Sequence, residues 1–238
     1  MRAMILAAGL GTRLMPLTEN KPKALVEIKG TPLLEIIINK LKSEGFTDII
    51  INVHHFGNQI VEFLKSKNNF NINIQISDET DKLLDTGGGI YNAKWFLERE
   101  KSFLVYNVDI ISDINLQKMY WSHIQTNALV TLAVKERETS RILQFDTENN
   151  QLCRWKNLTT GEKKISRQSE SNLYTSAFSG IHILNSDIFN LITEKGSFSI
   201  IDTYLRLAKD YKIISYQHDN SSWFDLGRYE HVLNYNKF

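Results

Sequence analysis

Residues 3–18 read AMILAAGLGTRLMPLT and carry the clearest structural signal in the chain. The run Ala3–Leu6 is short and apolar, as in a buried β-strand. Glycines follow at once, and glycine lets backbone N–H groups approach an anion closely. Arg13 and Lys23 add positive charge, so the segment suits the binding of a triphosphate. A tight turn with two incidental basic residues accounts for the glycine spacing equally well.

Two common phosphate-binding motifs do not fit this loop. A dinucleotide-binding fingerprint needs a third Gly or Ala at the position of Leu14, with an acidic residue further on. A P-loop ends in Gly-Lys-Ser or Gly-Lys-Thr, and the sequence contains neither ending. Both motifs are therefore set aside for this loop.

Strand-like and helix-like segments alternate after this loop. Leu33–Leu41 has helical spacing of apolar residues, and Ile49–Val53 is a β-branched run typical of a strand. This alternation predicts an α/β domain built on a largely parallel sheet. Further strands are expected at 72–76, 103–106, 128–134, 142–145, 177–184 and 213–216, and helices at 60–64, 88–97, 187–192, 200–208 and 229–235. Residues 159–171 are polar and predict a surface loop or hairpin.

Composition narrows the function classes. The chain has 238 residues, 42% of them hydrophobic, and a net charge of +1, which argues against disorder and against a dedicated nucleic-acid binder. Its one cysteine, Cys153, allows no intrachain disulfide or cysteine-based zinc site. No stretch approaches the roughly 18 apolar residues of a membrane span. We expect one cytoplasmic domain over residues 1–238 that binds neither nucleic acid nor membrane; its oligomeric state is not predicted.

Several motifs together resemble those of the sugar-1-phosphate nucleotidylyltransferases. The opening Gly9-x-Gly11-Thr12-Arg13-Leu14-x-Pro16-Leu17-Thr18, followed by Pro22-Lys23, is similar to the start of that family. Leu84–Ile90, with the sequence LDTGGGI, and the compact length resemble its short bacterial branch, which includes N-acetylmuramate-1-phosphate uridylyltransferases. The resemblance extends along nearly the whole chain.

The resemblance implies a fold and an organisation. The fold is the Rossmann-like nucleotide-diphospho-sugar transferase fold, a central mixed, mostly parallel sheet flanked by helices. About 1–125 would form the nucleotide-binding half and about 126–238 the sugar-phosphate-binding half. The chain ends soon after the motif Trp223–Gly227 with no hexapeptide repeats, so we expect no β-helix acyltransferase domain.

The resemblance also implies the residues that hold the nucleotide. The glycine loop contributes Ala8, Gly9, Gly11, Thr12, Arg13 and Lys23, and the nucleobase is contacted by Glu79 and Gly88. Arg13, Lys23 and Asp109 would be the catalytic residues. As alternatives, Glu79 is a solvated loop charge and Thr86 caps the helix that follows.

Two carboxylates are expected to bind Mg²⁺. Asp109 follows a buried strand, and ligands of α/β sheets bind at the carboxyl ends of strands. Asp225, in the motif Trp223–Gly227, is implied as the second ligand. Mg²⁺ prefers such oxygen ligands. Val108 stands where the family usually has Gly. A helix cap at Asp109 and a structural turn at Gly227 are the alternatives.

The sugar phosphate is expected to contact Asn107, Lys156, Ser179 and Gly180. Lys156 falls where the family carries Glu-Lys-Pro, although the flanking Glu and Pro are absent here. Close strand packing is the alternative for Gly180. A lactyl carboxylate, as in N-acetylmuramate, invites a cation, and Arg141, Arg154 and Arg167 are all candidates.

The implied reaction joins an NTP, with UTP favoured, to a sugar 1-phosphate, with N-acetylmuramate 1-phosphate favoured, and releases pyrophosphate. Its attacking phosphate is already ionised near neutral pH, so the lack of an obvious base agrees with it. GTP with a mannose or heptose 1-phosphate, and CTP with phosphocholine, are alternatives. A catalytically silent nucleotide-sugar sensor on the same fold is a further one.

Overall fold

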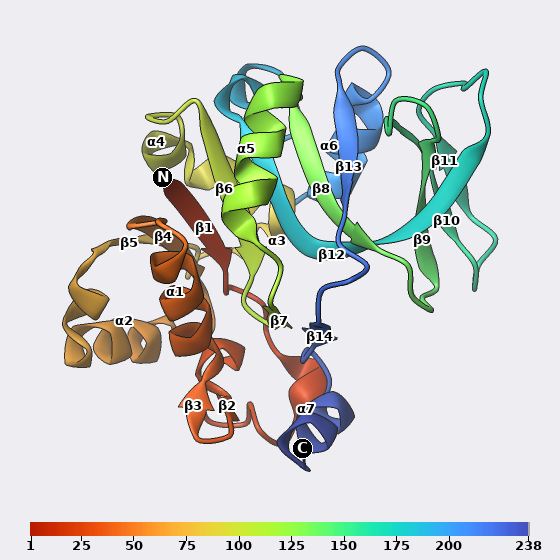
Figure 1. Ribbon diagram of the computed structural model, residues 1–238. Coiled ribbons are helices and arrows are strands. Elements are labelled where there is room, and N and C mark those ends of the chain that lie inside the picture. The colour runs from red at the N-terminus through yellow and green to blue at the C-terminus, as the bar shows by residue number, and fades with distance from the viewer. Residues whose placement is uncertain (238) are drawn as a thin grey trace.

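Ten strands form one central sheet in the computed structural model, which describes residues 1–237 (Figure 1). The first half of the chain supplies four parallel strands in the order β5-β4-β1-β6. Their bounds are β1 (Arg2–Leu6), β4 (Asp48–Val53), β5 (Asn73–Asp78) and β6 (Ser102–Asn107). Their parallel pairing confirms the α/β prediction. It also puts the carboxyl ends of β1, β4 and β6 at one edge of the sheet.

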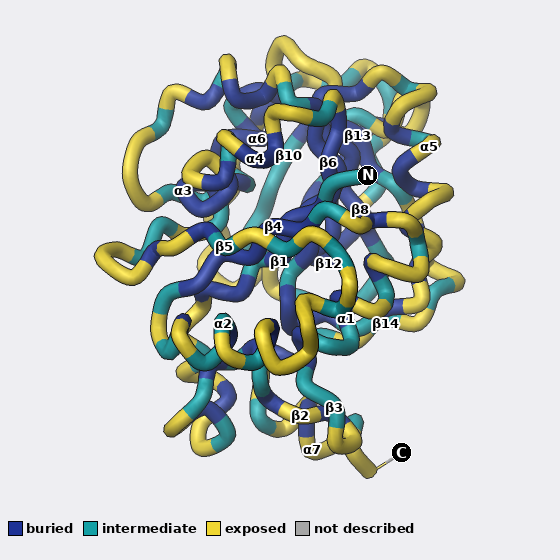
Figure 2. The backbone as a smooth tube through the Cα atoms, turned by 90° about the vertical axis from the view of Figure 1, so that its left-hand side faces the viewer, coloured by how far each residue is buried: buried dark blue, intermediate teal, exposed yellow. Residues whose placement is uncertain are grey.

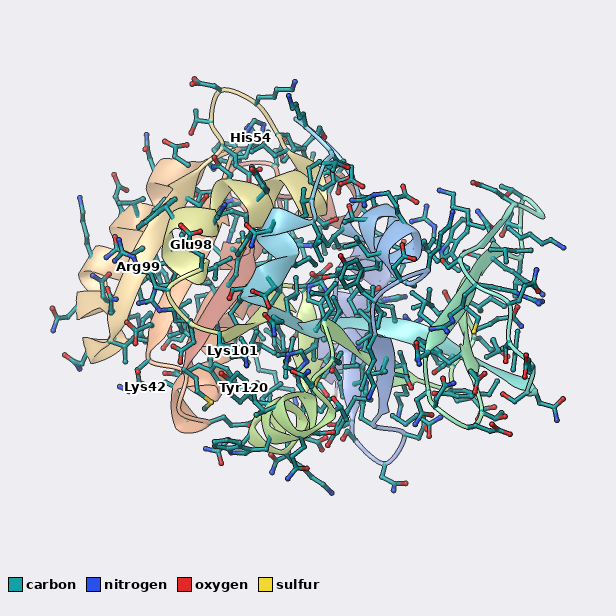
Figure 3. The ribbon with its side chains drawn as sticks, turned by 90° about the horizontal axis from the view of Figure 1, so that it is seen from above. Lys42, His54, Glu98, Arg99, Lys101 and Tyr120 are labelled. Carbon is teal, nitrogen blue, oxygen red and sulfur yellow. The ribbon has the colours of Figure 1, made fainter. Side chains whose placement is uncertain are left out.

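The second half of the chain extends this sheet with mainly antiparallel strands. The long strand β12 (Leu173–Asn185) pairs with β6 and β8 at one end and with β9 at the other. The remaining strands are β8 (Val130–Lys135), β9 (Arg141–Asp146), β10 (Leu152–Asn157), β11 (Lys163–Ile165) and β13 (Ile213–Gln217). Strands β9–β11 reach away from the parallel half, and seen from above they carry side chains on both faces (Figure 3). The sheet is therefore mixed, as predicted.

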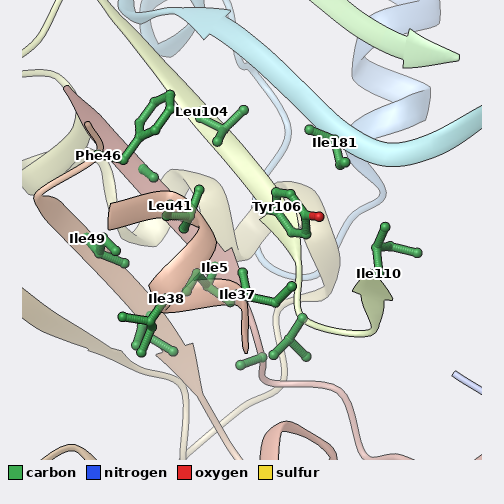
Figure 4. Packing of buried hydrophobic residues seen from close by; sticks show 14 of the residues in the cluster. Ile5, Ile37, Ile38, Leu41, Phe46, Ile49, Leu104, Tyr106, Ile110 and Ile181 are labelled. Carbon is green, nitrogen blue, oxygen red and sulfur yellow. The ribbon is translucent and has the colours of Figure 1, made fainter. Parts of the chain in front are cut away.

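Helices cover both faces of the sheet because side chains alternate along its strands. Ala3 and Ile5 point into a cluster formed with α1 (Leu33–Ser43), α2 (Gly57–Ser66) and α5 (Leu116–Thr126), part of which is shown in Figure 4. Met4, between them, points into a second cluster. Its helices are α3 (Asp85–Asn92), α4 (Lys94–Leu97) and α6 (Ile200–Leu207). In Figure 2 the mostly buried strands run between the helices of the two clusters, so the domain has three layers.

A third, smaller cluster joins the beginning of the chain to its end. Leu14 from the glycine loop and Leu33 pack against Leu226 and Val232. The neighbouring elements are the hairpin of β2 (Glu27–Ile28) and β3 (Thr31–Pro32), and helix α7 (Tyr229–Lys237). A separate two-stranded sheet pairs β7 (Ile110–Ser112) with β14 (Trp223–Asp225). These contacts bring the C-terminal motif beside the glycine loop.

Some elements differ from the predicted ones. The helix expected over 88–97 is two helices, α3 and α4, divided at Ala93. The α-helix expected over 187–192 is replaced by a 3₁₀ helix at Ser186–Asn190. Helix α5 and strands β7, β10 and β14 were not predicted. The hairpin of β10 and β11, with the loop after it, confirms the prediction for 159–171. Within residues 1–237, no helix is long and apolar enough to span a membrane.

Candidate active site

The glycine loop leaves β1 and forms a tight 3₁₀ turn at Thr12–Leu14. Gly11 has φ +69°, and a Cβ atom there would lie 2.9 Å from Cγ2 of Thr18. The Thr18 hydroxyl also donates a hydrogen bond to the Gly11 carbonyl at 2.9 Å. Only glycine satisfies both the left-handed conformation and this close approach. The loop is thus fixed from inside, and Thr12 and Arg13 remain exposed.

A cavity of about 440 Å³ lies at the carboxyl ends of β1, β4 and β6. This is the edge where ligands of open α/β sheets bind. Cations, carboxylates and loop backbone all line it, so it suits a polar, charged ligand. The predicted site residues in its lining are Ala8, Gly9, Arg13, Lys23, Glu79, Asn107 and Asp109. We call it the nucleotide cavity below.

Asp109 and Asp225 come together through the small β7–β14 sheet. Asp225 lies opposite Ile110, the residue after Asp109, and the Leu226 N–H donates to the Asp109 carbonyl at 2.8 Å. A Cβ atom on Gly227 would lie 2.5 Å from Asp109 Oδ2 and 2.9 Å from Asp225 Oδ1. The two predicted metal ligands therefore flank a single point.

Positive charge surrounds the same point. Lys23 Nζ lies 2.7 Å from Asp109 Oδ2, and an Arg13 nitrogen lies 3.2 Å from the Gly227 Cβ position. Asp109 itself is 7% exposed, so its charge is largely shielded from water. Side chains far apart in the sequence thus form one compact cluster of two carboxylates and two cations, and the structure brings these four predicted residues together.

The donor set fits a hard divalent cation. Within residues 1–237 no group of three or more His, Cys, Asp or Glu side chains surrounds a possible metal position. Mg²⁺ is commonly held by one or two carboxylates, with substrate phosphates and water completing its shell. Asp109, which lines the nucleotide cavity, and Asp225, which flanks the same point, match that pattern. Val108, which replaces the usual Gly, is fully buried in the core cluster and leaves this arrangement intact.

Glu79 is 3% exposed, so it is not a solvated loop charge. Its carboxylate accepts hydrogen bonds from Asn52 Nδ2 at 2.7 Å and from the Leu84 N–H at 3.1 Å. Asn52 in turn accepts from the Ala7 N–H at 2.7 Å. Burial raises the pKa of the Glu79 carboxyl, and these hydrogen bonds oppose that rise. Glu79 thereby links the glycine loop to the segment before α3.

The three glycines of α3 do not line the nucleotide cavity: Gly87 and Gly88 pack against the segment before α6, and Gly89 packs against Glu79 and Asn52. A Cβ atom on Gly87 would overlap the Phe198 ring, and one on Gly88 would lie 2.3 Å from the Gly196 carbonyl. Thr86 lines the cavity, and its hydroxyl accepts from the Ile200 N–H at 3.0 Å, at the start of α6. Gly88 therefore permits close packing beside the cavity, and Thr86 caps α6 instead of its own helix.

The predicted sugar-phosphate residues separate into two groups. Asn107 lines the nucleotide cavity, and Gly180, with φ +74°, lets strand β12 approach it, since a Cβ atom there would lie 2.8 Å from Asn107 Nδ2. Ser179 is fully buried, and its hydroxyl is 2.7 Å from His218 Nε2. Gly180 therefore lies against Asn107, whereas the Ser179 hydroxyl contacts His218 and does not line the cavity.

Lys156 does not join the other predicted residues. It follows Trp155 on β10, and neighbouring residues of a strand point to opposite faces. Trp155 lines a second cavity, of about 450 Å³, with Leu143 and Lys164, which are its partners on β9 and β11. Lys156, paired with Ile142 and Lys163, is on the other face. The register of this hairpin, which the sequence pattern did not reveal, places Lys156 on the face away from the second cavity.

Arg137 is the functional candidate that the sequence reasoning missed. It lines the second cavity, and it also lines a third, of about 620 Å³, that contains Asp225. Its guanidinium donates to the Phe178 carbonyl at 3.0 Å and lies 4.3 Å from the centre of the Trp223 ring. Burial lowers the pKa of Arg137, and the charge of Asp225 opposes this. In the charged run Lys135–Glu138 it resembles a solvated residue, which hid it.

Comparisons with known proteins agree with this geometry. The curated relatives include a bifunctional sugar-1-phosphate nucleotidylyltransferase/acetyltransferase from Sulfurisphaera tokodaii, 30% identical over the whole chain but only 55% of its own length. An N-acetylmuramate alpha-1-phosphate uridylyltransferase from Neisseria meningitidis is 43% identical over 48% of the chain and 49% of its own length. One of that name from Caulobacter vibrioides is 29% identical over 89% of the chain and 86% of its own length. The chain thus spans about half the length of the first relative, and its match with the second covers about half of each protein.

Solved structures share the fold. A putative glucose-1-phosphate thymidylyltransferase from Bacillus anthracis superposes with a TM-score of 0.80 over the whole chain and 94% of its own, at 19% identity. HddC from Yersinia pseudotuberculosis, complexed with GMP-PN, gives 0.77 over 99% and 98%, at 22% identity. Among protein families, residues 2–238 match the one described as nucleotidyl transferase. The chain belongs to the nucleotidyl transferase family.

Proposed function

We propose that this chain transfers a nucleotidyl group from an NTP to a sugar 1-phosphate and releases pyrophosphate, with Mg²⁺ as its cofactor. The observation that carries the proposal is the convergence of Asp109, Asp225 and Arg13 on the position that a Gly227 Cβ would occupy. Lys23 completes the cluster through its contact with Asp109. Residues 1–125 would bind the nucleotide and 126–238 the sugar phosphate.

The cluster matches what this reaction requires. A sugar phosphate is largely dianionic near neutral pH, so its oxygen can attack the α-phosphate without a general base. The main obstacle is the repulsion between two polyanions, which preorganised charges reduce. Arg13 and Lys23 would hold the triphosphate and offset the charge that develops on the departing pyrophosphate. Mg²⁺, held by Asp109 and Asp225, would supply further neutralisation of the phosphates.

Different parts of the nucleotide cavity suit the phosphates and the nucleoside of the NTP. The exposed backbone of Gly9 and the buried Ala8 line the cavity beside the cations, where the phosphates would lie. Glu79, Leu83 and Thr86 line it further along, which leaves that part for the nucleoside. A uracil ring presents one N–H donor between two carbonyl groups, and the Glu79 carboxyl in the cavity lining is the proposed acceptor for that donor.

The acceptor would enter through the second cavity, which we call the acceptor cavity. It is lined by Arg137, Arg141, Trp155 and Phe178, among others, and Arg137 joins it to the surroundings of Asp225. Arg137 has no ion-pair partner within residues 1–237. We assign it to the 1-phosphate of the acceptor, in the role that sequence resemblance gave to Lys156.

We propose UTP and N-acetylmuramate 1-phosphate as the substrate pair. Two relatives named N-acetylmuramate alpha-1-phosphate uridylyltransferases support this pair. A guanylyltransferase is the second candidate, because relatives named mannose-1-phosphate guanyltransferase match 96% of the chain at 28% identity. A solved neighbour also holds GMP-PN.

A substrate matrix tests the proposal. The purified full chain is incubated with Mg²⁺ and each of UTP, GTP, CTP, ATP and dTTP, combined with a panel of sugar 1-phosphates and phosphocholine, and pyrophosphate release is followed. We expect turnover with UTP and N-acetylmuramate 1-phosphate that EDTA abolishes. Nucleotide binding without pyrophosphate release from any pair would instead identify a silent sensor.

A further inference from the structure

The acceptor cavity has a chemical character of its own. Apolar walls come from Trp155, Phe178 and Leu143, and three cations, Arg137, Arg141 and Lys164, stand around them. Asp202 is the acid in the lining that faces these cations. Flat aromatic walls suit the apolar face of a sugar ring, and the excess of cations suits an acceptor with more negative charge than one phosphate brings.

The three cations are not equivalent. Lys164 lies 2.7 Å from Asp202 and 3.7 Å from Glu162, so its charge is already compensated. Arg137 also lines the third cavity together with Asp225, on the side where the 1-phosphate would lie. Arg141 forms no ion pair and its side chain makes no hydrogen bond within residues 1–237. Arg141 is therefore the cation still available for a ligand.

The sequence left three arginines as candidates for binding the lactyl carboxylate, and only Arg141 lines the acceptor cavity. Arg154 neighbours Trp155 on β10 and therefore points to the face that carries Lys156. Arg167 donates a hydrogen bond to the side chain of Gln151 and does not line the acceptor cavity. Arg141, opposite Asn157 in the β9–β10 pair, shares the face of Leu143 and Trp155.

Spacing along the chain limits the distance between Arg141 and Arg137, the residue assigned to the 1-phosphate. Arg137 and Arg141 are four residues apart, so their Cα atoms are separated by at most about 14 Å. Both side chains line the acceptor cavity, so both cations are presented to one ligand. A single sugar with anionic groups on two sides of the ring can contact both, whereas a sugar with only the 1-phosphate leaves Arg141 unpaired.

We infer that Arg141 binds a second anionic group of the acceptor, a carboxylate, and thereby selects an acidic sugar 1-phosphate over a neutral one. The planar guanidinium offers a bidentate geometry that matches a carboxylate. This inference rests on the proposed function, since it concerns the acceptor of that reaction. Arg141 is a specificity residue in this account and takes no part in the transfer step.

The test compares two acceptors that differ only in the lactyl ether, N-acetylmuramate 1-phosphate and N-acetylglucosamine 1-phosphate, at saturating UTP. Wild-type protein should prefer the acidic acceptor in kcat/KM. Arg141→Gln should lower kcat/KM for that acceptor about ten- to a hundred-fold, chiefly through KM, as expected for a lost charge-assisted hydrogen bond. Its value for the neutral acceptor should stay within about twofold, and Arg141→Lys should retain part of the preference.

Lys163→Gln is the matched control, because it removes one positive charge from the opposite face of the same hairpin. It should leave both acceptors unaffected. If Arg141→Gln lowers both acceptors equally, or neither, Arg141 does not read the carboxylate, although the proposed reaction stands. A wild-type preference for the neutral sugar would overturn the inference in the same way. Absence of turnover with every nucleotide and acceptor would instead overturn the proposed function. Should Arg141→Gln melt below the assay temperature, Arg141→Lys decides by the same ratio of the two acceptors.

Discussion

The backbone N–H of Leu226 donates a hydrogen bond to the carbonyl oxygen of Asp109, at 2.8 Å. This bond fixes the residue beside Asp225 to the other proposed metal ligand. Leu226 also packs with Leu14, the neighbour of Arg13, in the small cluster that joins the two ends of the chain. The geometry of the charged centre therefore depends on backbone pairing and apolar packing as well as on the charged side chains themselves.

Replacing Asp109 tests the role of its charge. Asp109→Asn keeps the shape but removes the anion that faces Lys23 and the proposed Mg²⁺, so turnover should fall by about 10²–10³-fold, as for other preorganised electrostatic groups. Pyrophosphate release measures turnover, and circular dichroism checks the fold. Asp210→Asn, on an exposed turn, is the control and should behave as wild type. Near-normal turnover of Asp109→Asn would remove Asp109 from the mechanism.

Gly227 offers a steric test of the same centre. In Gly227→Ala the new methyl group would lie 2.5 Å from Asp109 Oδ2 and 2.9 Å from Asp225 Oδ1, so the carboxylates must move apart. We expect a loss of turnover of at least about tenfold, since small displacements at a catalytic centre are costly. Gly161→Ala, which is strained by φ +74° but has open space around it, should lower the melting temperature without lowering turnover. Equal activity of both variants would contradict the proposed geometry.

Substitutions of Arg137 and Lys156 should affect the KM for the sugar 1-phosphate differently. Arg137→Ala should raise KM for the sugar 1-phosphate at least about tenfold, because it removes the cation beside Asp225. Lys156→Ala should change KM by less than about twofold, because Lys156 is on the other face of β10. Initial rates at saturating UTP measure both. The reverse order would restore the role that the sequence resemblance gave to Lys156.

Buried histidines should make the protein sensitive to acid. Burial lowers the pKa of His123 to about 4, of His182 to about 3 and of His218 to about 4. Below the ordinary pKa of about 6.5 the unfolded chain binds protons that the folded chain does not, so stability is complete above that pH and falls as pH drops toward about 4. Each such group contributes up to about 1.4 kcal/mol per pH unit within that window.

Urea unfolding at a series of pH values measures this loss. His123→Gln should flatten the dependence of unfolding free energy on pH between about 6.5 and 4, because glutamine does not titrate there. His55→Gln, which replaces an exposed histidine, is the control for the substitution itself. A steep and unchanged dependence in His123→Gln would show that other groups cause the acid sensitivity.

Local patterns predicted most of the fold. Ala3–Leu6 and Ile49–Val53 are apolar runs whose burial on both faces is that of parallel strands, as found. Helix α5 was missed although Leu116, Met119, Tyr120 and His123 follow the helical spacing of its buried face. Strands β7 and β14 have three residues each, too few for a period to register, and their pairing joins distant parts of the chain.

The site was predictable where a motif is contiguous. Arg13 and Lys23 lie in the loop that follows β1, and Asp109 follows the carboxyl end of β6. Because these two strands are parallel neighbours, the three side chains are expected to lie close together, as they do. The roles of Lys156 and Gly88 depend on register and on distant partners, Trp155 with Lys164 and Gly88 with Gly196, which no single segment encodes. Arg137 required knowledge of what lies across the cavity, namely Trp223 and Asp225.

The shared metal site of Asp109 and Asp225 is the central claim, and Mn²⁺ titration followed by electron paramagnetic resonance tests it most directly. In the presence of a non-hydrolysable UTP analogue, the wild-type chain should bind Mn²⁺ in excess of what the analogue alone binds. Asp109→Asn and Asp225→Asn should each weaken that binding at least about tenfold while nucleotide affinity without metal stays within about twofold. Unchanged Mn²⁺ binding in both variants would contradict the account.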